Sequence, residues 1–382
     1  MKKRALMYAS VASMIQQFNM ENIRLLLADG YEVDVACNLQ QGSTITPEKI
    51  AAMKAELEEM GVRVFHVPVP RKIFAIRDIV TAFRMTRDII AQGEYSLTHC
   101  HSPIGGVLCR LANRFSGCYG KARMIYTAHG FHFFKGAPLL NWLIFYPLEW
   151  FCSRYTDVLI TINLEDFALA QKKMKAKQVV YVPGIGVDVT KFRNAAAMSM
   201  EVRESLGLTE GEMLLLSVGE LSVRKNHEVV LRALAQLELD AYQYLICGLG
   251  PLENRLHELV RELKMEDRVQ FLGYRNDIPQ IMNAADVYLF PSLQEGLPVA
   301  LMESMAAGKP VACSRIRGNT DLIEEGGGVL FDPVSVDECA DAIRSLLDSD
   351  YEQMGHFNAE KIQGFSRETV EKRMSEIYKR GL

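Results

Sequence analysis

The residues whose types and spacing suggest chemistry most clearly are two acids, Glu295 and Glu303, eight positions apart in SLQEGLPVALMESMAAGKPV, residues 292–311. If the whole stretch were helical, the two carboxylates would lie about 80° apart around the helix axis, which does not fit one simple face. Proline suits the first helical position, where no N–H is needed. The pattern therefore predicts a helix that starts at Pro298, leaves Glu295 and Gly296 in the preceding loop, and carries Glu303 in its second turn.

Sugar hydroxyls are the ligands that we expect for these acids. A carboxylate accepts hydrogen bonds from the paired hydroxyls of a ribose or a sugar, and such a charge-assisted bond is about twice as strong as a neutral one. The hypothesis is that Glu303 binds a ribose and Glu295 a second sugar. The alternative is that both acids are solvated residues at the start of a helix.

Two loops offer groups that could neutralise a phosphate. The start of the predicted helix presents unpaired N–H groups over residues 297–300, which favour an anion together with the helix dipole, and Gly296 lets the backbone come close. In VGELSVRKNHEVVLRAL, residues 218–234, a loop with Arg224 and Lys225 precedes a helix that Asn226 could cap. The arginine fork and the lysine point charge could neutralise a diphosphate, although a pair of ordinary surface charges is the alternative.

Four histidines in THCHSP and TAHGFHFF follow two predicted strands and would suit a zinc site by residue type. No nearby carboxylate or cysteine pair completes a tetrahedral set with familiar spacing, so we expect no metal. A neutral His129 in the site is the stronger hypothesis. The chain has no G-x-S-x-G elbow, which argues against acyl transfer, and CGLGPLENRL lacks the third glycine of a dinucleotide fingerprint.

Short β-rich runs alternate with helical patterns through both halves of the chain, which is typical of right-handed βαβ units and a parallel sheet. The expected strands are ALMYAS, EVDVAC, VRVFHV, SLTHCH, RMIYTAH and DVLITIN in the first half, and EMLLLSVGE, QYLICG, RVQFLG, DVYLFPS, KPVACS and GGVLFD in the second. The glycine-rich stretch VPGIGVDVTKF, residues 182–192, marks a break between the halves.

We therefore predict an α/β protein with two Rossmann-like, doubly wound parallel-sheet domains that face a central cleft. The first covers residues 1–187 and the second residues 188–365, and a helix over 366–382, capped by Ser366, packs back on the first. In open α/β sheets, ligands bind outside the carboxyl ends of the strands. The residues that follow the predicted strands are 10–13, 99–102, 129–135, 219–225, 248–251, 273–275 and 291–298.

The composition limits the partners. The net charge of −4 is small and no long basic run marks a nucleic-acid groove, so we do not expect nucleic acid as a partner. The charge is uneven, since residues 1–190 carry 22 Lys and Arg against 16 Asp and Glu. A solvated basic face is the commoner explanation, and contact with an anionic surface is the alternative. Eight scattered cysteines without a C-x-x-C pair predict reduced thiols and a cytoplasmic location.

Two stretches could be mistaken for membrane or export signals. MKKRALMYASVASMI imitates a secretion signal, but its polar residues and the elements that follow favour a first β-strand. FHFFKGAPLLNWLIFYPLEWF, residues 131–151, gathers aromatic residues, and its apolar part is shorter than the ~20 residues that a membrane span needs. This segment is either core or a partly exposed surface that touches a bilayer or a lipid-linked substrate.

Together these motifs resemble a known family. EGLPVALMESMAAGKPV is similar to the E-x7-E segment of the family 4 retaining glycosyltransferases, a group with the GT-B fold. VGELSVRKNH, FLGYRNDI and VPGIGVDVTKF occur in the order that this family shows. The resemblance covers essentially the whole chain, and HSPIGGVLCRLA and TAHGFHFFKG look like the branch that builds bacterial capsular, exopolysaccharide or O-antigen repeat units.

The resemblance implies that the first domain binds the acceptor and the second binds a nucleotide-sugar donor. Glu303 would bind the donor ribose, and Glu295 the donor sugar, while His129 would lie beside the transferred sugar; Glu295 and His129 are the catalytic candidates. Arg224 and Lys225 would meet the diphosphate. The remaining candidates are Gly219, Tyr274, Arg275, Gly296, Leu297, Pro298 and Val299 for the donor, with the backbone at 274–275 on the nucleobase, and Ser13, His101, Phe131 and Lys135 for the acceptor or the cleft.

The sequence departs from the family pattern at three places. Glu220 stands where many members have arginine, so phosphate binding would rest more heavily on Lys225 and Arg224. SVASMIQQF has no glycine where the family has a glycine-rich first loop. The hinge reads Ile-Gly-Val-Asp at 185–188 in place of Asn-Gly-Val-Asp.

The implied activity is transfer of a sugar from a nucleotide-diphosphate sugar, with a UDP-sugar favoured, to a hydroxyl of a lipid-linked glycan, for example on a polyprenyl diphosphate. The anomeric configuration would be retained by front-face attack, with the leaving diphosphate helping to deprotonate the acceptor and with no metal or cofactor. Two alternatives are a nucleotide-sugar epimerase of the same fold and a non-catalytic sugar-nucleotide-binding protein. The expected location is the cytoplasm, with peripheral contact at the inner face of the cell membrane.

Overall fold

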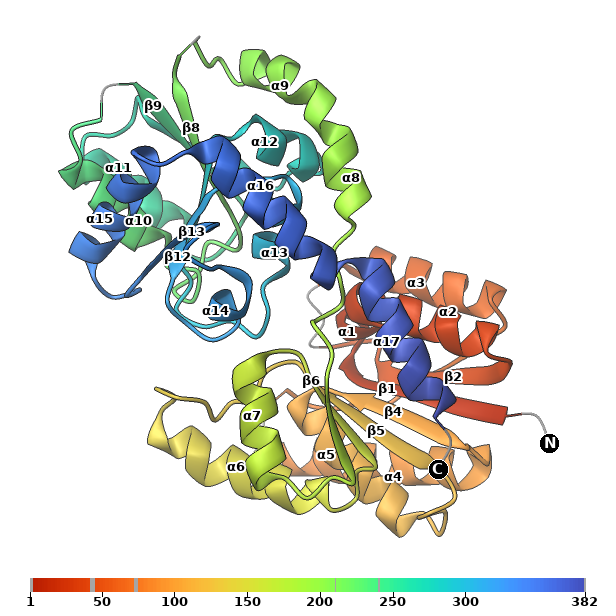
Figure 1. Ribbon diagram of the computed structural model, residues 1–382. Helices are drawn as coiled ribbons and strands as arrows, with labels where there is room; N and C mark the ends of the chain where they lie inside the picture. The colour runs from red at the N-terminus through yellow and green to blue at the C-terminus, as the bar shows by residue number, and fades with distance from the viewer. Residues whose placement is uncertain (1–2, 42–44, 72–74, 210, 240, 381–382) are drawn as a thin grey trace. The chain divides into compact units, whose positions relative to one another are not determined.

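The computed structural model describes residues 3–41, 45–71, 75–209, 211–239 and 241–380, which form two compact units (Figure 1). The amino-terminal unit comprises Met1–Ile185 and Val370–Leu382, and the carboxy-terminal unit comprises Gly186–Thr369. The chain passes between them in the glycine-rich loop where the sequence placed a boundary after residue 187. Each unit is built on its own parallel sheet, as the predicted α/β class requires.

The sheet of the amino-terminal unit has seven parallel strands in the order β3-β2-β1-β4-β5-β6-β7. Its central strands β1, β4 and β5 are buried along most of their length, as expected where helices cover both faces of a parallel sheet. The strands are β1 (Lys3–Val11), β2 (Tyr31–Asn38), β3 (Arg63–His66), β4 (Leu97–His101), β5 (Arg123–Ala128), β6 (Val158–Thr161) and β7 (Gln178–Tyr181).

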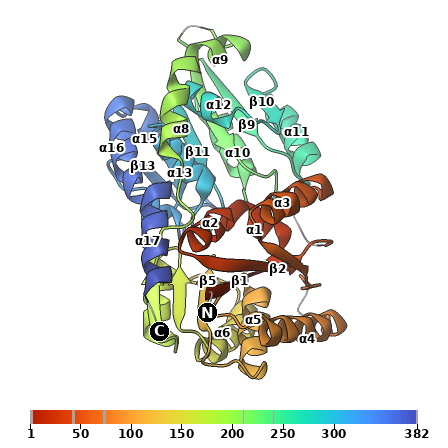
Figure 2. The ribbon, with the colours of Figure 1, turned by 90° about the vertical axis from the view of Figure 1, so that its right-hand side faces the viewer.

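The helices of this unit form a hydrophobic core on each face of the sheet. Side chains of α1 (Ala12–Phe18), α2 (Met20–Ala28), α3 (Pro47–Glu59) and α17 (Arg367–Lys379) share one core. Side chains of α4 (Ile76–Gly93), α5 (Pro103–Phe115), α6 (Leu139–Ser153) and α7 (Leu164–Lys173) share the other. Figure 2 shows α2 and α4 on opposite sides of the sheet.

The end of the chain completes the amino-terminal unit. Val370, Met374, Ile377 and Tyr378 on α17 are buried in the same core as α1 and α2. Ser366 accepts a hydrogen bond from the Thr369 N–H at 3.2 Å, and so caps α17 as the sequence predicted. The last helix therefore belongs to the first sheet, although more than a hundred residues of the other unit precede it.

The sheet of the carboxy-terminal unit has six parallel strands in the order β10-β9-β8-β11-β12-β13. The strands are β8 (Met213–Val218), β9 (Tyr242–Cys247), β10 (Val269–Gly273), β11 (Val287–Phe290), β12 (Val311–Ser314) and β13 (Gly328–Phe331). One core joins the sheet to α10 (His227–Gln236), α11 (Glu253–Glu262) and α15 (Val336–Leu347). The other helical segments are α8 (Val189–Asn194), η1 (Ala195–Met198), α9 (Ser199–Ser205), α12 (Ile278–Ala284), α13 (Val299–Ala306), α14 (Asn319–Leu322), α16 (Tyr351–Lys361) and η2 (Ile362–Phe365).

Both sheets are doubly wound, with the strand order reversing beside the first strand of each unit. The reversal lies between β1 and β4 in one unit and between β8 and β11 in the other. A crevice opens at such a switch point, outside the carboxyl ends of the strands, and ligands of open α/β sheets bind there. The loops after these four strands carry most of the site residues predicted from the sequence.

Three local predictions need correction. The strand β7 was not predicted, because its four residues QVVY are too short a run between a lysine-rich stretch and Pro183. The helix α13 starts at Val299, with Pro298 as its N-cap, one residue later than predicted. Asn226 immediately precedes α10, but its side chain does not cap the helix, since its amide donates to the carbonyls of Pro291 at 3.2 Å and Pro333 at 2.8 Å.

The eight cysteines, all within the described residues, are free thiols. Across the described ranges, no helix combines the length and the apolar character that a membrane span requires.

Candidate active site

Glu295 is the centre of an ion-pair cluster at the carboxyl end of the second sheet. Its Oε1 accepts hydrogen bonds from Lys225 Nζ and from Arg224 Nη1, each at 2.8 Å. The Lys225 and Glu295 side chains are 13% and 10% exposed, whereas Arg224 is 45% exposed. The two cations that the sequence assigned to a diphosphate therefore lie together, and one carboxylate oxygen holds both. We call Arg224, Lys225 and Glu295 the cation cluster.

The surroundings of Lys225 prepare its ammonium for an anion. Burial lowers the pKa of Lys225, and the carboxylate of Glu295 opposes that shift. The ammonium also lies 4.7 Å from the centroid of the Phe290 ring, whose face attracts a cation. In such a partly dry site a phosphate interacts more strongly with the charge than it would at the open surface.

Glycines let the loops around the cation cluster approach each other closely. A Cβ atom on Gly248 would lie 1.8 Å from the Gly219 carbonyl oxygen. A Cβ atom on Gly318, whose φ is +82°, would lie 2.3 Å from the Gly296 carbonyl oxygen. A larger residue at Gly248 or Gly318 would therefore displace the loops that carry the predicted donor residues.

Arg317 supports the Glu295 loop and was not singled out from the sequence. Its buried guanidinium donates to the Glu295 carbonyl through Nε and through Nη2, at 3.3 Å each. Arg317 lies three positions beyond the end of a predicted strand, in SRIRGN, where only the following glycine hinted at a close approach. Its contact with Glu295 joins the ends of β11 and β12, which no local pattern reveals.

The start of α13 lies in the same loop and has no capping side chain. Residues 296–299 lead into the helix, and a helix start without a cap leaves backbone N–H groups for a ligand. Gly296, Leu297, Pro298 and Val299 thus lie together with Glu295. They remain the predicted donor contacts.

Glu303, in the second turn of α13, is a half-buried acid whose charge is poorly compensated. Burial raises its pKa to about 7, and the Lys191 ammonium only partly opposes this shift. Among the described residues, none donates a hydrogen bond to the Glu303 carboxylate. At neutral pH this acid is therefore divided between its protonated and charged forms, and a donor of hydrogen bonds such as a ribose would favour the charged form.

The predicted nucleobase loop follows β10 and is joined to the other two loops by backbone hydrogen bonds. The Gly219 N–H donates to Cys247 O at 2.9 Å, and the Gly248 N–H donates to Gly273 O at 2.8 Å. Tyr274 is largely exposed, and Arg275 makes a two-pronged ion pair with Asp277 at 2.8 and 2.5 Å. The Arg275 side chain is thus already engaged, which leaves the backbone of this loop for the predicted base contact.

A row of three histidines lies at the switch point of the amino-terminal unit. His101 Nδ1 lies 3.1 Å from His129 Nε2, and the rings of His99 and His101 have centroids 4.1 Å apart. His99 is fixed by hydrogen bonds of 2.8 Å to the hydroxyls of Tyr378 and Thr127. We call His99, His101 and His129 the histidine chain.

Burial keeps the histidine chain neutral. It lowers the pKa of His99 to about 3 and that of His129 to about 4, and it lowers the pKa of His101 well below the usual value. The contact of 3.2 Å between His101 Nε2 and the Met7 sulfur requires a proton on Nε2, because a thioether cannot donate. A neutral His101 then accepts at Nδ1 from His129 Nε2–H. His129 is left with a lone pair on Nδ1, which can accept a hydrogen bond from a sugar hydroxyl.

The other candidates of this unit fall into two groups. Ser13, His101 and Phe131 are buried, at 4%, 1% and 3% exposed, and Phe131 stacks on Phe133 with ring centroids 4.7 Å apart. Lys135 is exposed, and its N–H donates to Glu165 Oε1 at 2.9 Å. The structure therefore brings His101 to His129 but keeps the Lys135 side chain on the outer surface of the loop.

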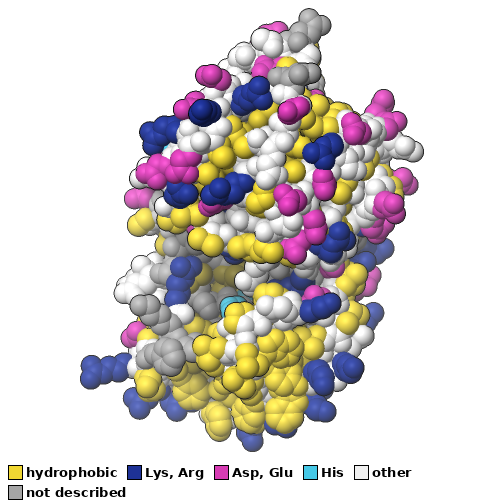
Figure 3. Space-filling model, turned by 90° about the vertical axis from the view of Figure 1, so that its left-hand side faces the viewer, with side chains coloured by type: hydrophobic (Ala, Val, Ile, Leu, Met, Phe, Trp, Pro, Cys, Tyr) yellow, Lys and Arg dark blue, Asp and Glu magenta, His cyan; other side chains and the backbone are white. Residues whose placement is uncertain are grey.

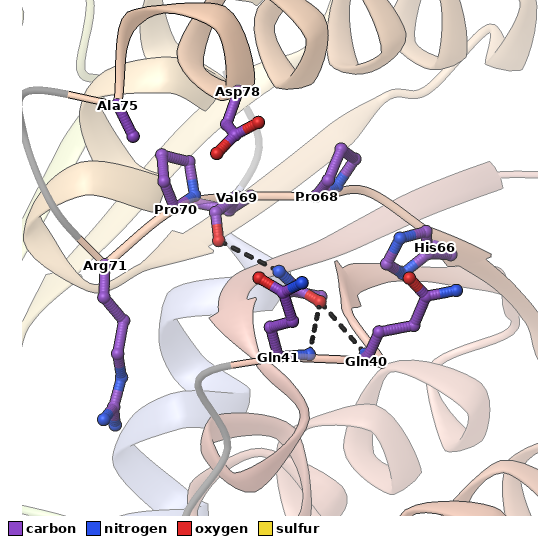
Figure 4. A pocket seen from close by; sticks show the side chains of 10 residues that line it. Gln40, Gln41, His66, Pro68, Val69, Pro70, Arg71, Ala75 and Asp78 are labelled. Atoms are coloured by element: carbon purple, nitrogen blue, oxygen red, sulfur yellow. Dashed lines mark hydrogen bonds between the residues drawn. The ribbon is translucent and has the colours of Figure 1, made fainter.

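A polar pocket of 350 Å³ at the ends of β2 and β3 was not predicted from the sequence (Figure 4). Asn38 organises it: the Asn38 amide donates to Val69 O at 3.1 Å and accepts the N–H groups of Gln40 and Gln41 at 3.0 and 2.9 Å. Its lining also includes His66, Arg71 and Asp78. Side-chain amides, the Asp78 carboxylate and the Arg71 guanidinium can all hydrogen-bond to hydroxyls, so the pocket suits a glycan. The only sign of this pocket in the sequence is the polar run NLQQ, residues 38–41, which follows the predicted strand EVDVAC.

Over the residues that the structure describes, no group of three or more His, Cys, Asp or Glu side chains is placed to hold a metal ion.

Comparisons with known proteins match the whole of this architecture. The profile of the family described as "Glycosyl transferase 4-like domain" matches residues 15–184, and that of "Glycosyl transferases group 1" matches residues 199–362. EpsD of Bacillus subtilis (strain 168) is 33% identical to this chain over 330 residues. Its name describes a glycosyltransferase and specifies no substrate. That match covers 85% of this chain and 82% of EpsD.

A second relative carries a more specific name. The UDP-Gal:alpha-D-GlcNAc-diphosphoundecaprenol alpha-1,3-galactosyltransferase of Escherichia coli is 27% identical, over 87% of this chain and 84% of the relative. Among solved structures, Anabaena Alr3699/HepE in complex with UDP-glucose superimposes with a TM-score of 0.74 at 20% identity, over 99% of both chains. WaaG, a glycosyltransferase involved in lipopolysaccharide biosynthesis, gives a TM-score of 0.70 at 17% identity, over 99% of this chain and 100% of WaaG. At these identities the structures establish the fold alone, which is GT-B.

Proposed function

The chain belongs to the family 4 glycosyltransferases of GT-B fold, and on that basis we propose that it transfers a sugar from a UDP-sugar to a lipid-linked glycan, with retention of configuration. The observation that carries the proposal is the cation cluster beside the uncapped start of α13. The UDP-Gal in the name of the Escherichia coli relative and the UDP-glucose complex of Alr3699/HepE support the choice of donor.

In this proposal the carboxy-terminal unit binds the donor. Lys225, Arg224 and the N–H groups that lead into α13 hold the diphosphate, and Glu303 accepts hydrogen bonds from the ribose. Glu295 positions the two cations through Oε1 and presents its other carboxylate oxygen to a hydroxyl of the donor sugar. The exposed loop at 274–275 takes the uracil through its backbone.

The chemical step breaks the bond between the anomeric carbon and the oxygen of the β-phosphate. The acceptor hydroxyl attacks from the same face, a new glycosidic bond forms, and the hydroxyl proton passes to the departing phosphate oxygen. Negative charge grows on the diphosphate, so the prearranged cations and amides stabilise the transition state more than the ground state. No metal or enzymatic nucleophile is part of this scheme.

The amino-terminal unit binds the acceptor in this proposal. His129 is neutral and offers a lone pair on Nδ1, which suits a sugar hydroxyl and avoids attraction between a charged imidazolium and the diphosphate. The polar pocket around Asn38 offers amides and Asp78 to the glycan. The diphosphoundecaprenol substrate in the name of the Escherichia coli relative supports a polyprenyl-diphosphate acceptor, used at the inner face of the cell membrane in polysaccharide synthesis.

The test follows the products and the nucleotide. Purified protein is incubated with UDP-sugars and a lipid-linked glycan, and we expect release of UDP only when acceptor is present, at an unchanged rate in EDTA. A new sugar nucleotide without acceptor would instead identify an epimerase, and binding of UDP-sugars without any product would identify a binding protein. A complete loss of activity in EDTA, restored by a divalent ion, would contradict the metal-free scheme.

A further inference from the structure

One face of the amino-terminal unit leaves several large apolar side chains exposed on neighbouring helices. Figure 3 shows hydrophobic side chains gathered over the lower part of the molecule, with Lys and Arg at their margins. Leu139 and Leu143 on α6 are 74% and 65% exposed. The exposed apolar residues of this face are Ile76 and Val80 on α4, Phe115 on α5, and Leu139, Leu140, Leu143, Leu148 and Phe151 on α6. We call this set the apolar face.

The helix α6 carries large apolar side chains on its outer side as well as on its inner side, which is unusual for a surface helix. Trp142, Phe145, Tyr146 and Trp150 pack against the core of the unit. The leucines of the apolar face point away from that core, and no described residue covers them. A helix that is apolar on its inner and outer sides is normally buried, so the outer side of α6 lacks a partner among the residues that the structure describes.

A small apolar cavity joins the parts of this face. It has a volume of 150 Å³ and lies between α4, α5 and α6, lined among others by Ile79, Val107, Phe145 and Leu148. Phe83 and Phe115 also contact each other, with ring centroids 6.3 Å apart. The three helices therefore form one continuous surface.

Positive charge surrounds the apolar face. Residues 71–154 carry 11 Lys and Arg against 4 Asp and Glu. Two of these acids are already neutralised, since Glu149 is buried in an ion pair with Arg110 and Asp88 pairs with Arg87. The exposed cations of the segment thus have few acidic neighbours to offset them.

Aromatic and basic side chains alternate at the end of α6 in the pattern of a membrane interface. The Arg154 guanidinium lies 3.9 Å from the centroid of the Trp150 ring, and Arg114 lies 5.0 Å from that of Tyr119. Phe151 and Tyr155 are in edge contact at 5.5 Å. Aromatic rings and long cations prefer the headgroup layer, where the apolar part is buried and the charge stays in water.

We propose that the apolar face inserts into the surface of an anionic phospholipid bilayer, with α6 as the deepest element. The exposed leucines would enter the acyl-chain boundary, and the surrounding cations would bind anionic headgroups. A second copy of this chain would present the same positive rim, so it is a poorer complement than an anionic membrane. The inference rests on the proposed function in one respect, because it supplies the reason for a lipid-linked acceptor.

The helix α4 connects this surface to the polar pocket. Ile76 and Val80 belong to the apolar face, whereas Ala75 and Asp78 line the pocket around Asn38. A glycan whose lipid tail remains in the bilayer could therefore reach the pocket along the first turn of α4. The acceptor would be bound without being extracted from the membrane.

The two tryptophans of the chain give a direct test, because Trp142 and Trp150 both lie on α6. Wild-type protein is titrated with vesicles of phosphatidylcholine and phosphatidylglycerol, and with vesicles of phosphatidylcholine alone. We expect a blue shift of tryptophan emission, and quenching by brominated acyl chains, with the anionic vesicles, and weaker binding as salt screens the rim. Absence of binding to anionic vesicles at low salt would overturn the proposal.

A matched pair of variants locates the contact. Leu140→Glu with Leu143→Glu should weaken partition into anionic vesicles on the order of 100-fold, at about tenfold for each leucine withheld from the bilayer. Met200→Glu with Val334→Glu, at exposed apolar positions of the other unit, should leave partition unchanged. Equal effects of the two pairs on partition would overturn the proposal. So would a wild type that does not bind vesicles but sediments as a dimer, if only the leucine variant is monomeric.

Binding of UDP-glucose, followed by thermal shift, separates this inference from the proposed function and confirms that the variants are folded. Both variants should bind UDP-glucose like the wild type. Wild type that binds UDP-glucose but not vesicles would refute the membrane surface alone. Wild type that binds vesicles but no sugar nucleotide would refute the proposed donor site alone.

Discussion

In the carboxy-terminal unit, Lys225 and Arg224 are paired with the carboxylate of Glu295, whereas in the amino-terminal unit burial removes the charge from the histidine chain. The first arrangement suits an anion that must be held and then stabilised as it leaves. The second suits neutral hydroxyls that must be oriented. Under the proposed function each unit is electrostatically matched to one substrate, so we expect changes in the two units to fail in different ways.

The largest effect is expected from breaking the cation cluster. Lys225→Ala removes the most buried cation and leaves Glu295 with the exposed Arg224 alone. Turnover should fall on the order of 10²–10³-fold, the usual effect of removing one prearranged donor to a developing charge. The measurements are acceptor-dependent UDP release and calorimetric binding of UDP-glucose.

Lys361→Ala is the matched control for that change. Lys361 makes a surface ion pair with Glu324 at 2.6 Å in the same unit, away from the loops of the site. This variant should keep wild-type turnover. Near-normal turnover of Lys225→Ala would show that the diphosphate binds elsewhere.

A smaller effect, about tenfold on the affinity for UDP-glucose, is expected from Glu303→Gln. This variant sharpens the contrast because Glu303, unlike Glu295, has no cation among the described residues close enough to fix its charge. Ribose hydroxyls favour the carboxylate, so the affinity of wild type for UDP-glucose should fall as the pH drops below about 7. The glutamine variant should bind about tenfold more weakly at pH 8 and show little dependence on pH. The esterified diphosphate of UDP-glucose does not titrate near neutrality, so calorimetry across pH reports the protein.

The same variant should weaken UDP-glucose binding but stabilise the folded protein at high pH. Because the folded pKa of Glu303 is raised to about 7, its contribution to stability is present at low pH and is lost as the pH rises through 7. Glu303→Gln should therefore raise the melting temperature at pH 8 by ~2–4 °C and change it little at pH 5. The exposed Glu360→Gln on α16 should do neither, and a lower melting temperature of Glu303→Gln at pH 8 would contradict the assignment.

The smallest effect is expected in the histidine chain. Met7→Leu conserves volume but removes the sulfur that accepts the His101 Nε2–H, so the tautomer of His101, and through it that of His129, should become mixed. Turnover should fall only about two- to fivefold, with the affinity for UDP-glucose unchanged. Nitrogen NMR of the histidine rings checks the tautomers, and Met124→Leu on β5 is the control. Unchanged tautomers in Met7→Leu would exclude this relay.

Local sequence patterns were sufficient to predict every described strand except β7 and to place the loops at the carboxyl ends of the strands. Each predicted run contains a strand, because buried parallel strands are mostly apolar, although β4 carries His99 and His101. The polar residues that follow the strands mark the carboxyl edge. Glu295, Arg224 and Lys225 could be placed in one site on that basis. Their pairing could not, since it joins residues 70 or more positions apart.

The parts that were not predicted depend on contacts between distant loops. Asn226 has the residue type and position of a helix cap, but its amide instead donates hydrogen bonds to two carbonyls that follow β11 and β13. Asn38 likewise ties the loop after β2 to the loop after β3 and so shapes the pocket. The neutral state of the histidines depends on their burial, which is a property of the folded unit and not of any local pattern.

The return of α17 to the first sheet has a consequence for biosynthesis. During translation, the segments of the amino-terminal unit emerge first, yet Tyr378 and Ile377, which hydrogen-bond to His99 and Arg123, emerge after the entire carboxy-terminal unit. Until then, one face of the first sheet lacks part of its cover, so a nascent chain stalled before residue 370 would expose an unfinished core to chaperones and proteases. Most of the amino-terminal unit is therefore synthesised first, but its core is complete only after α17 has been synthesised.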